Sequence, residues 1–325
     1  MREQGTGNRG QGRRGRPGTV DRGRGAFCGW GWQSLGALAL LALALPLRAD
    51  TFFVTVAGLG GEPDYVQRYT ADAKALDQAF RQGGADAHVT TLIGADATRE
   101  RLTQVLQQVA AAAKPGDDFI LVLIGHGTYD GVEYKFNLPG PDISAGELAA
   151  LCDHVAARRQ LVVDSTEASG AALAVLEVPG RRAVIAATKS GTEKNATVFA
   201  RYFVEALQDP AADLDKNQAI SGLEAFEYAQ RKVADFYSSQ KRLATEHAIN
   251  AEPKLLGSIT LVRFGQAQKA YADPAKRALL AQKEEIERKI DALNYQKDAL
   301  SDEDYRNQMT ALLLRLAKVQ KEIDQ

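Results

Sequence analysis

Residues with catalytic potential gather in two short segments of the sequence. A histidine, His126, stands between two glycines at 125–127, directly after the apolar run at 119–124. Hydroxyl and carboxyl side chains fill the second segment, 164–170, which reads Asp-Ser-Thr-Glu-Ala-Ser-Gly. An imidazole beside a hydroxyl or carboxyl group supports proton transfer or nucleophilic catalysis. Both segments follow apolar runs that predict strands, so the fold decides whether they meet.

A third segment, DLDKNQAISGLE at 213–224, has the ligand spacing of an EF-hand calcium loop. The predicted oxygen ligands are Asp213, Asp215, Asn217, the carbonyl of Ala219, Ser221 and Glu224. Gln218 stands at the sixth position, where glycine usually permits a sharp turn, so a left-handed backbone is expected there. The alternative is an acidic turn in which Ser221 caps a helix and Glu224 completes a capping box. Calcium is therefore the one cofactor that the sequence suggests, and zinc spacing is absent from it.

The first 49 residues predict an export signal. Residues 1–34 are rich in glycine and arginine, and the apolar stretch LGALALLALALPL follows them. This stretch suits a signal peptide that ends at Ala49, and it is short for a membrane span. The alternative is an uncleaved N-terminal anchor. We expect an exported protein, periplasmic or secreted, with no stable membrane anchor after removal of the signal.

The charge of the remaining chain is acidic. Eight arginines and two acidic residues fall in residues 1–49, so 32 of 40 basic and 39 of 41 acidic residues remain, a net charge of −7. This balance argues against nucleic acid as a partner. The remaining cysteine, Cys152, lies at an apolar position of a helical pattern, which is typical of a small core residue.

Alternating patterns of strand and helix predict an α/β fold with a mostly parallel central sheet. Strands are expected at 51–57, 87–94, 118–125, 160–164 and 182–188. Helices are expected at 64–82, 97–113, 196–208 and 222–240, and Ser144 with Glu147 predicts the capped start of another. Sites in such sheets form at the carboxyl ends of strands, so His126 should face the segment 164–170. His247 lines the same mouth or lies in a loop.

Residues 266–325 predict a helical hairpin with a coiled-coil seam. Apolar residues recur near heptad spacing within 274–299, and a second helix starts after the N-cap Ser301. Its apolar residues are Tyr305, Met309, Leu312, Leu316, Val319 and Ile323. The seam packs the two helices of the hairpin together. The sharper alternative is that residues 274–324 bind a partner or a second copy of the chain.

The order of these elements resembles the caspase-like fold, and most closely the legumain-like branch of cysteine peptidases, across about residues 51–260. The resemblance rests on Gly-His-Gly at 125–127, on Asp164 at a strand end and on Ser-Gly at 169–170. It implies a three-layer sandwich and a histidine that holds a cysteine as thiolate and protonates the leaving amine. It also implies that backbone N–H groups of Gly127 and of the nucleophile form an oxyanion hole.

The sequence departs from this family at the nucleophile, where no cysteine stands. Counting forward from Asp164 puts Thr166 at that position, and counting back from 169–170 puts Glu167 there. The first interpretation is an inactive relative that keeps the fold and a peptide groove. The second is an oxygen nucleophile, Ser165 or Thr166, with His126 as base and Asp164 or Glu167 as the orienting carboxylate. The third is a shared fold with unrelated chemistry.

We therefore expect a signal peptide at 1–49, a caspase/legumain-like domain at 50–265 and a helical hairpin at 266–325. The expected function is that of a pseudoenzyme, a peptidase-family protein without cysteine chemistry that binds a peptide or protein. The alternative is an active peptidase or hydrolase that uses His126 with Ser165 or Thr166.

Overall fold

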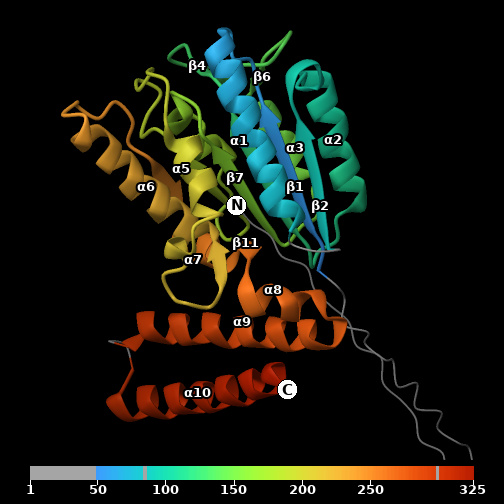
Figure 1. Ribbon diagram of the computed structural model, residues 1–325, viewed down its shortest axis with the longest axis vertical. Helices are drawn as coiled ribbons and strands as arrows, with labels where there is room; N and C mark the ends of the chain where they lie inside the picture. The colour runs from blue at the N-terminus through green and yellow to red at the C-terminus, as the bar shows by residue number, and fades with distance from the viewer. Residues whose placement is uncertain (1–48, 83–85, 298–299) are drawn as a thin grey trace, which may run out of the picture. The chain divides into compact units, whose positions relative to one another are not determined.

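The computed structural model describes residues 49–82, 86–297 and 300–325 (Figure 1). Its centre is a six-stranded sheet in the order β10-β8-β7-β3-β1-β2, in which β10 is antiparallel and the other neighbours are parallel. The strands are β1 (Thr51–Ala57), β2 (Ala87–Leu92), β3 (Asp118–Ile124), β7 (Arg159–Asp164), β8 (Arg182–Ala186) and β10 (Ile249–Ala251). The predicted mostly parallel sheet is confirmed.

Helices connect these strands and cover both faces of the sheet (Figure 1). They are α1 (Pro63–Arg81), α2 (Arg99–Ala112), α3 (Ala145–Asp153), α4 (Leu173–Leu176), α5 (Phe199–Ala206), α6 (Gly222–Ser239) and α7 (Pro253–Ser258). The start of α3 is fixed as predicted, because the Ser144 hydroxyl accepts from the Glu147 N–H and the Glu147 carboxylate accepts from the Ser144 N–H.

The two helical layers follow from the alternation of side chains along buried strands. On β3, Ile120 and Val122 pack into the core formed with α1, α5 and α6, whereas Leu121 and Leu123 pack toward α2, α3 and α4. Successive side chains of a strand point to opposite faces, so a continuous apolar run requires cover on both. The expected three-layer sandwich is therefore observed.

The sequence did not predict the short strands. A three-stranded sheet of β4 (Gly127–Tyr129), β5 (Tyr134–Phe136) and β6 (Ile143–Ser144) lies between β3 and α3 in the chain. A second small sheet pairs β9 (Ala219–Ser221) with β11 (Thr260–Arg263), and three short 3₁₀ turns are η1 (Gly94–Asp96), η2 (Ser169–Ala171) and η3 (Pro210–Ala212). Segments of two to four residues are too short to show a period.

The C-terminal helices are present as expected. They are α8 (Gly265–Ala272), α9 (Pro274–Tyr295) and α10 (Asp302–Asp324), and α9 packs along α10 (Figure 1). Two ion pairs tie α9 to the α/β domain: Arg277 contacts the buried Asp86 at 2.6 Å, and Arg263 contacts Glu284 at 2.6 Å. The hairpin is therefore fixed to the domain by charged contacts as well as by the chain.

None of the helices within the described ranges is long and apolar enough to cross a membrane. The predicted signal peptide lies outside the described residues, apart from Ala49.

Candidate functional site

The predicted meeting of two strand ends occurs at the carboxyl edge of the central sheet. Strands β3 and β7 are parallel neighbours, with Leu123 opposite Asp164. His126 follows β3 by two residues, and the segment 165–167 follows β7 directly. Parallel register therefore brings the two segments together, as expected for a site in this kind of sheet.

Glu167 is the residue of this segment that reaches the histidine. Its Oε1 lies 2.7 Å from Nδ1 of His126, and both side chains are mostly shielded from solvent. The Glu167 carboxylate raises the pKa of His126 through this hydrogen bond and its charge, against an opposing effect of burial. The pair therefore favours an imidazolium bound to a carboxylate.

Two tyrosines from α1 surround the imidazole. The Tyr69 hydroxyl lies 3.4 Å from Nε2 of His126, and the Tyr65 ring meets the imidazole edge-on with centroids 4.8 Å apart. Burial raises the pKa of Tyr69, with the negative charge of Glu167 adding to the effect. Tyr69 is therefore a neutral hydroxyl beside the ion pair.

The two predicted oxygen nucleophiles point elsewhere. The Ser165 hydroxyl donates to the Leu123 carbonyl at 2.7 Å, and Ser165 is 2% exposed. Thr166 is 0% exposed, and its Oγ1 lies 2.6 Å from the Tyr134 hydroxyl and 2.8 Å from Oδ1 of Asp164. Among the described contacts, neither hydroxyl has a hydrogen bond to His126.

Asp164, the predicted orienting carboxylate, lies beneath the site. It is 0% exposed, and burial raises its pKa to about 6. Its contacts are to Thr166 and not to His126, so Glu167 alone among the two predicted carboxylates orients the imidazole.

Gly127 has a packing reason to be glycine. A Cβ at this position would lie 2.4 Å from Oγ1 of Thr166 and 2.6 Å from the Tyr134 hydroxyl. No larger residue fits without moving the buried network, whatever the role of its backbone N–H group.

Three polar atoms around the site have no hydrogen-bond partner among the described residues. They are Nη2 of Arg68, Oε2 of Glu167 and Oδ2 of Asp164, and all three are inaccessible to solvent. The Arg68 guanidinium lies over the Tyr65 ring, 4.7 Å from its centroid, and over the Tyr69 ring at 5.5 Å. A positive group with spare donor capacity therefore stands beside the histidine.

The sequence patterns do not identify Tyr65, Arg68, Tyr69 and Tyr134 as site residues. The first three occupy the first turns of α1, the helix that follows β1, so they lie at the same carboxyl edge as His126. Their position after a strand end was the available signal. The spacing of Tyr65 and Tyr69 within the predicted helix at 64–82 instead favours a role in packing.

The other histidines and the cysteine do not join this site. His247 pairs with Glu193 at 2.5 Å, His154 contacts the Ala150 carbonyl, and His88 stacks on Phe52. Cys152 is buried within the second helical layer, as predicted, and burial raises the pKa of its thiol to about 12. Such a thiol is a poor nucleophile near neutral pH.

The acidic loop at 213–224 brings its carboxylates together. Single oxygen atoms of Asp213, Asp215 and Glu224 lie within 4.8 Å of one another. Burial raises the pKa of Asp215 to about 6, and the neighbouring Glu224 and Asp213 add to this effect. These three carboxylates have the arrangement of hard-cation ligands.

The same carboxylates also accept hydrogen bonds from their own loop. Asp213 accepts from the N–H groups of Asn217 and Gln218, and Glu224 accepts from the N–H groups of Leu214 and Ser221. The Ser221 hydroxyl caps α6 and completes the predicted capping box with Glu224. These hydrogen bonds account for the acidic residues of the loop without a bound ion, so calcium binding stays a prediction.

Gln218 has the left-handed backbone expected at the sixth position, with φ of 65°. Its side-chain Oε1 accepts from the N–H groups of Gln266 at 2.6 Å and Ala267 at 3.2 Å, at the start of α8. A glutamine here links the loop to the C-terminal helices, which a glycine cannot do.

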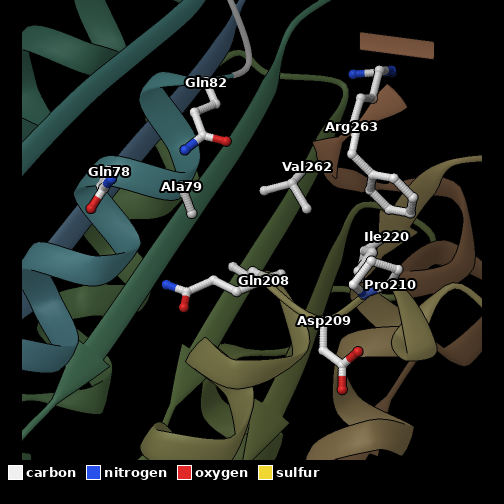
Figure 2. A pocket seen from close by; sticks show the side chains of 11 residues that line it. Gln78, Ala79, Gln82, Gln208, Asp209, Pro210, Ile220, Val262 and Arg263 are labelled. Atoms are coloured by element: carbon white, nitrogen blue, oxygen red, sulfur yellow. The ribbon is translucent and has the colours of Figure 1, made fainter. Parts of the chain in front are cut away.

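A surface cavity of about 330 Å³ lies on another part of the domain, and Figure 2 shows the side chains that line it. It is lined by Gln78, Ala79, Gln82, Leu207, Gln208, Asp209, Pro210, Ile220, Val262, Arg263 and Phe264. Its charged groups are engaged elsewhere, because Arg263 pairs with Glu284 and Asp209 accepts from Tyr228. Gln78 is 13 residues along α1 from Tyr65, roughly 20 Å of helix, so this cavity is separate from the histidine site.

One family model supports the fold assignment. A family model described as a caspase domain matches residues 64–168, which extend from α1 through His126 to Ala168. A crystal structure of a protein from Geobacter sulfurreducens is similar at 15% identity and a TM-score of 0.44, covering 67% of this chain and 100% of that one. None of the curated proteins compared with the chain matches it. The described domain has a caspase-like fold, the fold of a class of peptidases.

Proposed function

We propose that this chain is an exported, legumain-like relative of the caspase-fold peptidases that has lost cysteine chemistry and binds a peptide or protein. The observation that carries the proposal is the 2.7 Å contact between His126 and Glu167. Glu167 takes the place that counting back from Ser169 assigns to the nucleophile. A carboxylate at this position holds the imidazole in an ion pair. A thiol there would instead transfer its proton to the imidazole.

The surrounding hydroxyls give little support to the alternative of an oxygen nucleophile. A base must lie within hydrogen-bond reach of the hydroxyl group that it deprotonates. Ser165 donates to a carbonyl and Thr166 is held by Tyr134 and Asp164, so a hydrolytic mechanism would require both strand ends to rearrange.

The ligand that the site favours is a peptide with a carboxylate group. Arg68 has a donor without a partner among the described residues, whereas the positive charge of His126 is already paired with Glu167. A groove of about 540 Å³ lies along the same helix, lined by Gly61, Pro63, Val66, Gln67, Thr70, Ala71 and Lys74, on the side of α1 opposite Tyr65, Arg68 and Tyr69.

Three measurements test this proposal, the first two on the full chain. A fluorogenic peptide library should show no cleavage by the wild type or by His126→Ala. Cleavage by the wild type that His126→Ala abolishes would contradict the proposal and favour the hydrolase alternative.

Binding is measured by fluorescence anisotropy with labelled peptides that differ only in one Asp or Asn. We expect preference for the Asp peptides, lost in Arg68→Gln and kept in Arg101→Gln, an equal charge change on the exposed surface of α2. Equal binding of both peptides would exclude the carboxylate preference. Amino-terminal sequencing of the exported protein should give Asp50 first, as the signal prediction requires.

A further inference from the structure

Asp117 is a buried carboxylate without a basic partner. It directly precedes β3, at the amino edge of the central sheet, and it is 1% exposed. Its Oδ2 accepts from the Lys114 N–H at 2.7 Å, and its Oδ1 accepts from the Asp50 N–H at 2.9 Å. Within the described ranges no basic side chain forms an ion pair with it. A buried carboxylate is stabilised when a cation reaches it.

The neighbouring acids at this edge differ from Asp117 because they have basic partners. Asp118 pairs with Arg159 of β7 at 2.5 Å. Asp86, which precedes β2, pairs with Arg277 of α9 at 2.6 Å. Among the described residues, Asp117 is therefore held by main-chain donors where its neighbours are held by guanidinium groups.

The Asp50 nitrogen is held in place by the sheet and not by the residue before it. The Asp50 carbonyl accepts from the Asp118 N–H at 3.0 Å, and the Thr51 N–H donates to the Asp86 carbonyl at 2.8 Å. Strand β1 begins at Thr51, and Ala49 is exposed. The contact between the Asp50 nitrogen and Asp117 therefore does not depend on what precedes Asp50.

The predicted signal cleavage site falls at this nitrogen. Hydrolysis of the Ala49–Asp50 peptide bond adds the hydroxyl of a water molecule to the Ala49 carbonyl carbon and a hydrogen to the Asp50 nitrogen. The resulting amino group takes up a proton near neutral pH. The amide that faces Asp117 thereby becomes an ammonium group, whose hydrogen bond to a carboxylate is roughly twice as strong as that of a neutral donor.

We propose that Asp117 is the binding site for the amino terminus that removal of residues 1–49 creates, so that processing adds an ion pair to the folded chain. The proposal rests on the export signal that the proposed function includes. The processed chain is then more stable than the uncleaved chain, in which Asp117 has main-chain amides alone. The pair lies at the amino edge of the sheet, away from His126 at the carboxyl edge, so it is independent of what the histidine site binds.

Thermal melts test the ion pair on two forms of the chain, one that starts at Asp50 and one that starts at Ala49. Each is released from a cleavable fusion, and each keeps every described helix and strand, since these lie within residues 51–324. At pH 6 the form that starts at Asp50 should melt roughly 2–4 °C higher. This difference should vanish in Asp117→Asn. Equal melting temperatures of the two forms, or a difference that Asp117→Asn leaves unchanged, would overturn the proposal.

Chemical labelling of the amino terminus needs no variant. The pH dependence of acetic anhydride labelling, mapped by mass spectrometry, should give the Asp50 α-amino group a pKa above about 9, against an ordinary value of about 8. The melting difference should therefore be fully present below the unfolded pKa and be lost as pH rises through the folded pKa. His88, 3.6 Å from the Asp50 carboxylate, is common to both forms, so its titration cancels in the difference. An ordinary α-amino pKa would overturn the proposal.

Amino-terminal sequencing of the exported protein separates this proposal from the proposed function. A first residue other than Asp50 would overturn both the predicted cleavage and the role of Asp117. Equal melting of the two forms, with Asp50 found first in the exported protein, would overturn the role of Asp117 alone.

Discussion

The histidine site and the acidic loop both concentrate polar groups, but they satisfy them in different ways. At the histidine site, side chains from separate elements meet one another: His126 follows β3, Glu167 follows β7, and Tyr69 comes from α1. In the acidic loop, Asp213 and Glu224 accept hydrogen bonds from main-chain groups a few residues away. A site assembled by tertiary structure retains buried atoms without partners, whereas a local turn satisfies its own.

The difference matters for function because spare polar capacity is what a ligand can use. Arg68 and Glu167 each have a buried atom without a partner among the described residues. Glu224 has both carboxylate oxygens engaged in the loop. A ligand at the histidine site gains contacts, whereas a cation at the loop competes with existing hydrogen bonds.

The largest expected effect comes from breaking the buried network under the histidine site. Thr166→Val keeps the shape but removes the hydroxyl between Tyr134 and Asp164, so it should reduce the free energy of unfolding by about 2–3 kcal/mol. Urea denaturation measures this change. Thr90→Val on β2 is the control, since no hydrogen bond of its hydroxyl is observed among the described residues. Equal losses of unfolding free energy at the two positions would show that the hydrogen bonds of Thr166 add no stability beyond that of an ordinary threonine hydroxyl.

Removing a side chain from the acidic loop should reduce the free energy of unfolding by less than Thr166→Val does. Glu224→Ala removes the acceptor of the Leu214 and Ser221 N–H groups and should cost about 1–2 kcal/mol, in the range of a lost helix cap. Glu227→Ala, one turn along α6, removes a carboxylate without a cap and should cost less. If Glu224→Ala cost more than Thr166→Val, the contrast between the two regions would be reversed.

These two regions also show how far sequence reasoning extends. The mostly parallel sheet and the meeting of His126 with the segment 164–170 follow from alternating apolar runs, and the Ser221–Glu224 capping box follows from local spacing. The sequence pattern does not decide whether Thr166 or Glu167 faces His126. The Thr166 hydroxyl points inward because it forms a hydrogen bond with the Tyr134 hydroxyl. Tyr134 belongs to β5, a strand of three residues that periodicity does not reveal.

The effect of pH on the ion pair should be smaller still. Because the folded pKa of His126 is raised, the stabilisation is fully present below the unfolded pKa of about 6.5 and is lost as pH rises through the folded pKa. Glu167→Gln should therefore destabilise the protein at pH 6, by at most about 1 kcal/mol after solvent screening. At pH 9 the two proteins should melt alike. A difference that grows with pH would contradict this sign.

Calcium should have the smallest effect. If Asp213, Asp215 and Glu224 bind the ion weakly, calcium at a few times its dissociation constant stabilises the fold by less than about 1 kcal/mol. Thermal melts with calcium, with magnesium and with chelator measure this shift, and Asp215→Asn should abolish it. An unmoved melting temperature would remove the calcium prediction and leave the acidic turn.

The central claim is that Glu167 occupies the position of a nucleophile facing His126. It is tested most directly by Glu167→Cys, with Thr166→Cys as control, using the pH dependence of thiol alkylation mapped by mass spectrometry. We predict that the thiol introduced at position 167 has a pKa at least about one unit below the ordinary value of about 8.5. This lowering should vanish when His126→Ala is added, and the buried thiol at position 166 should react slowly throughout. An ordinary pKa at position 167, unchanged by His126→Ala, would contradict the account.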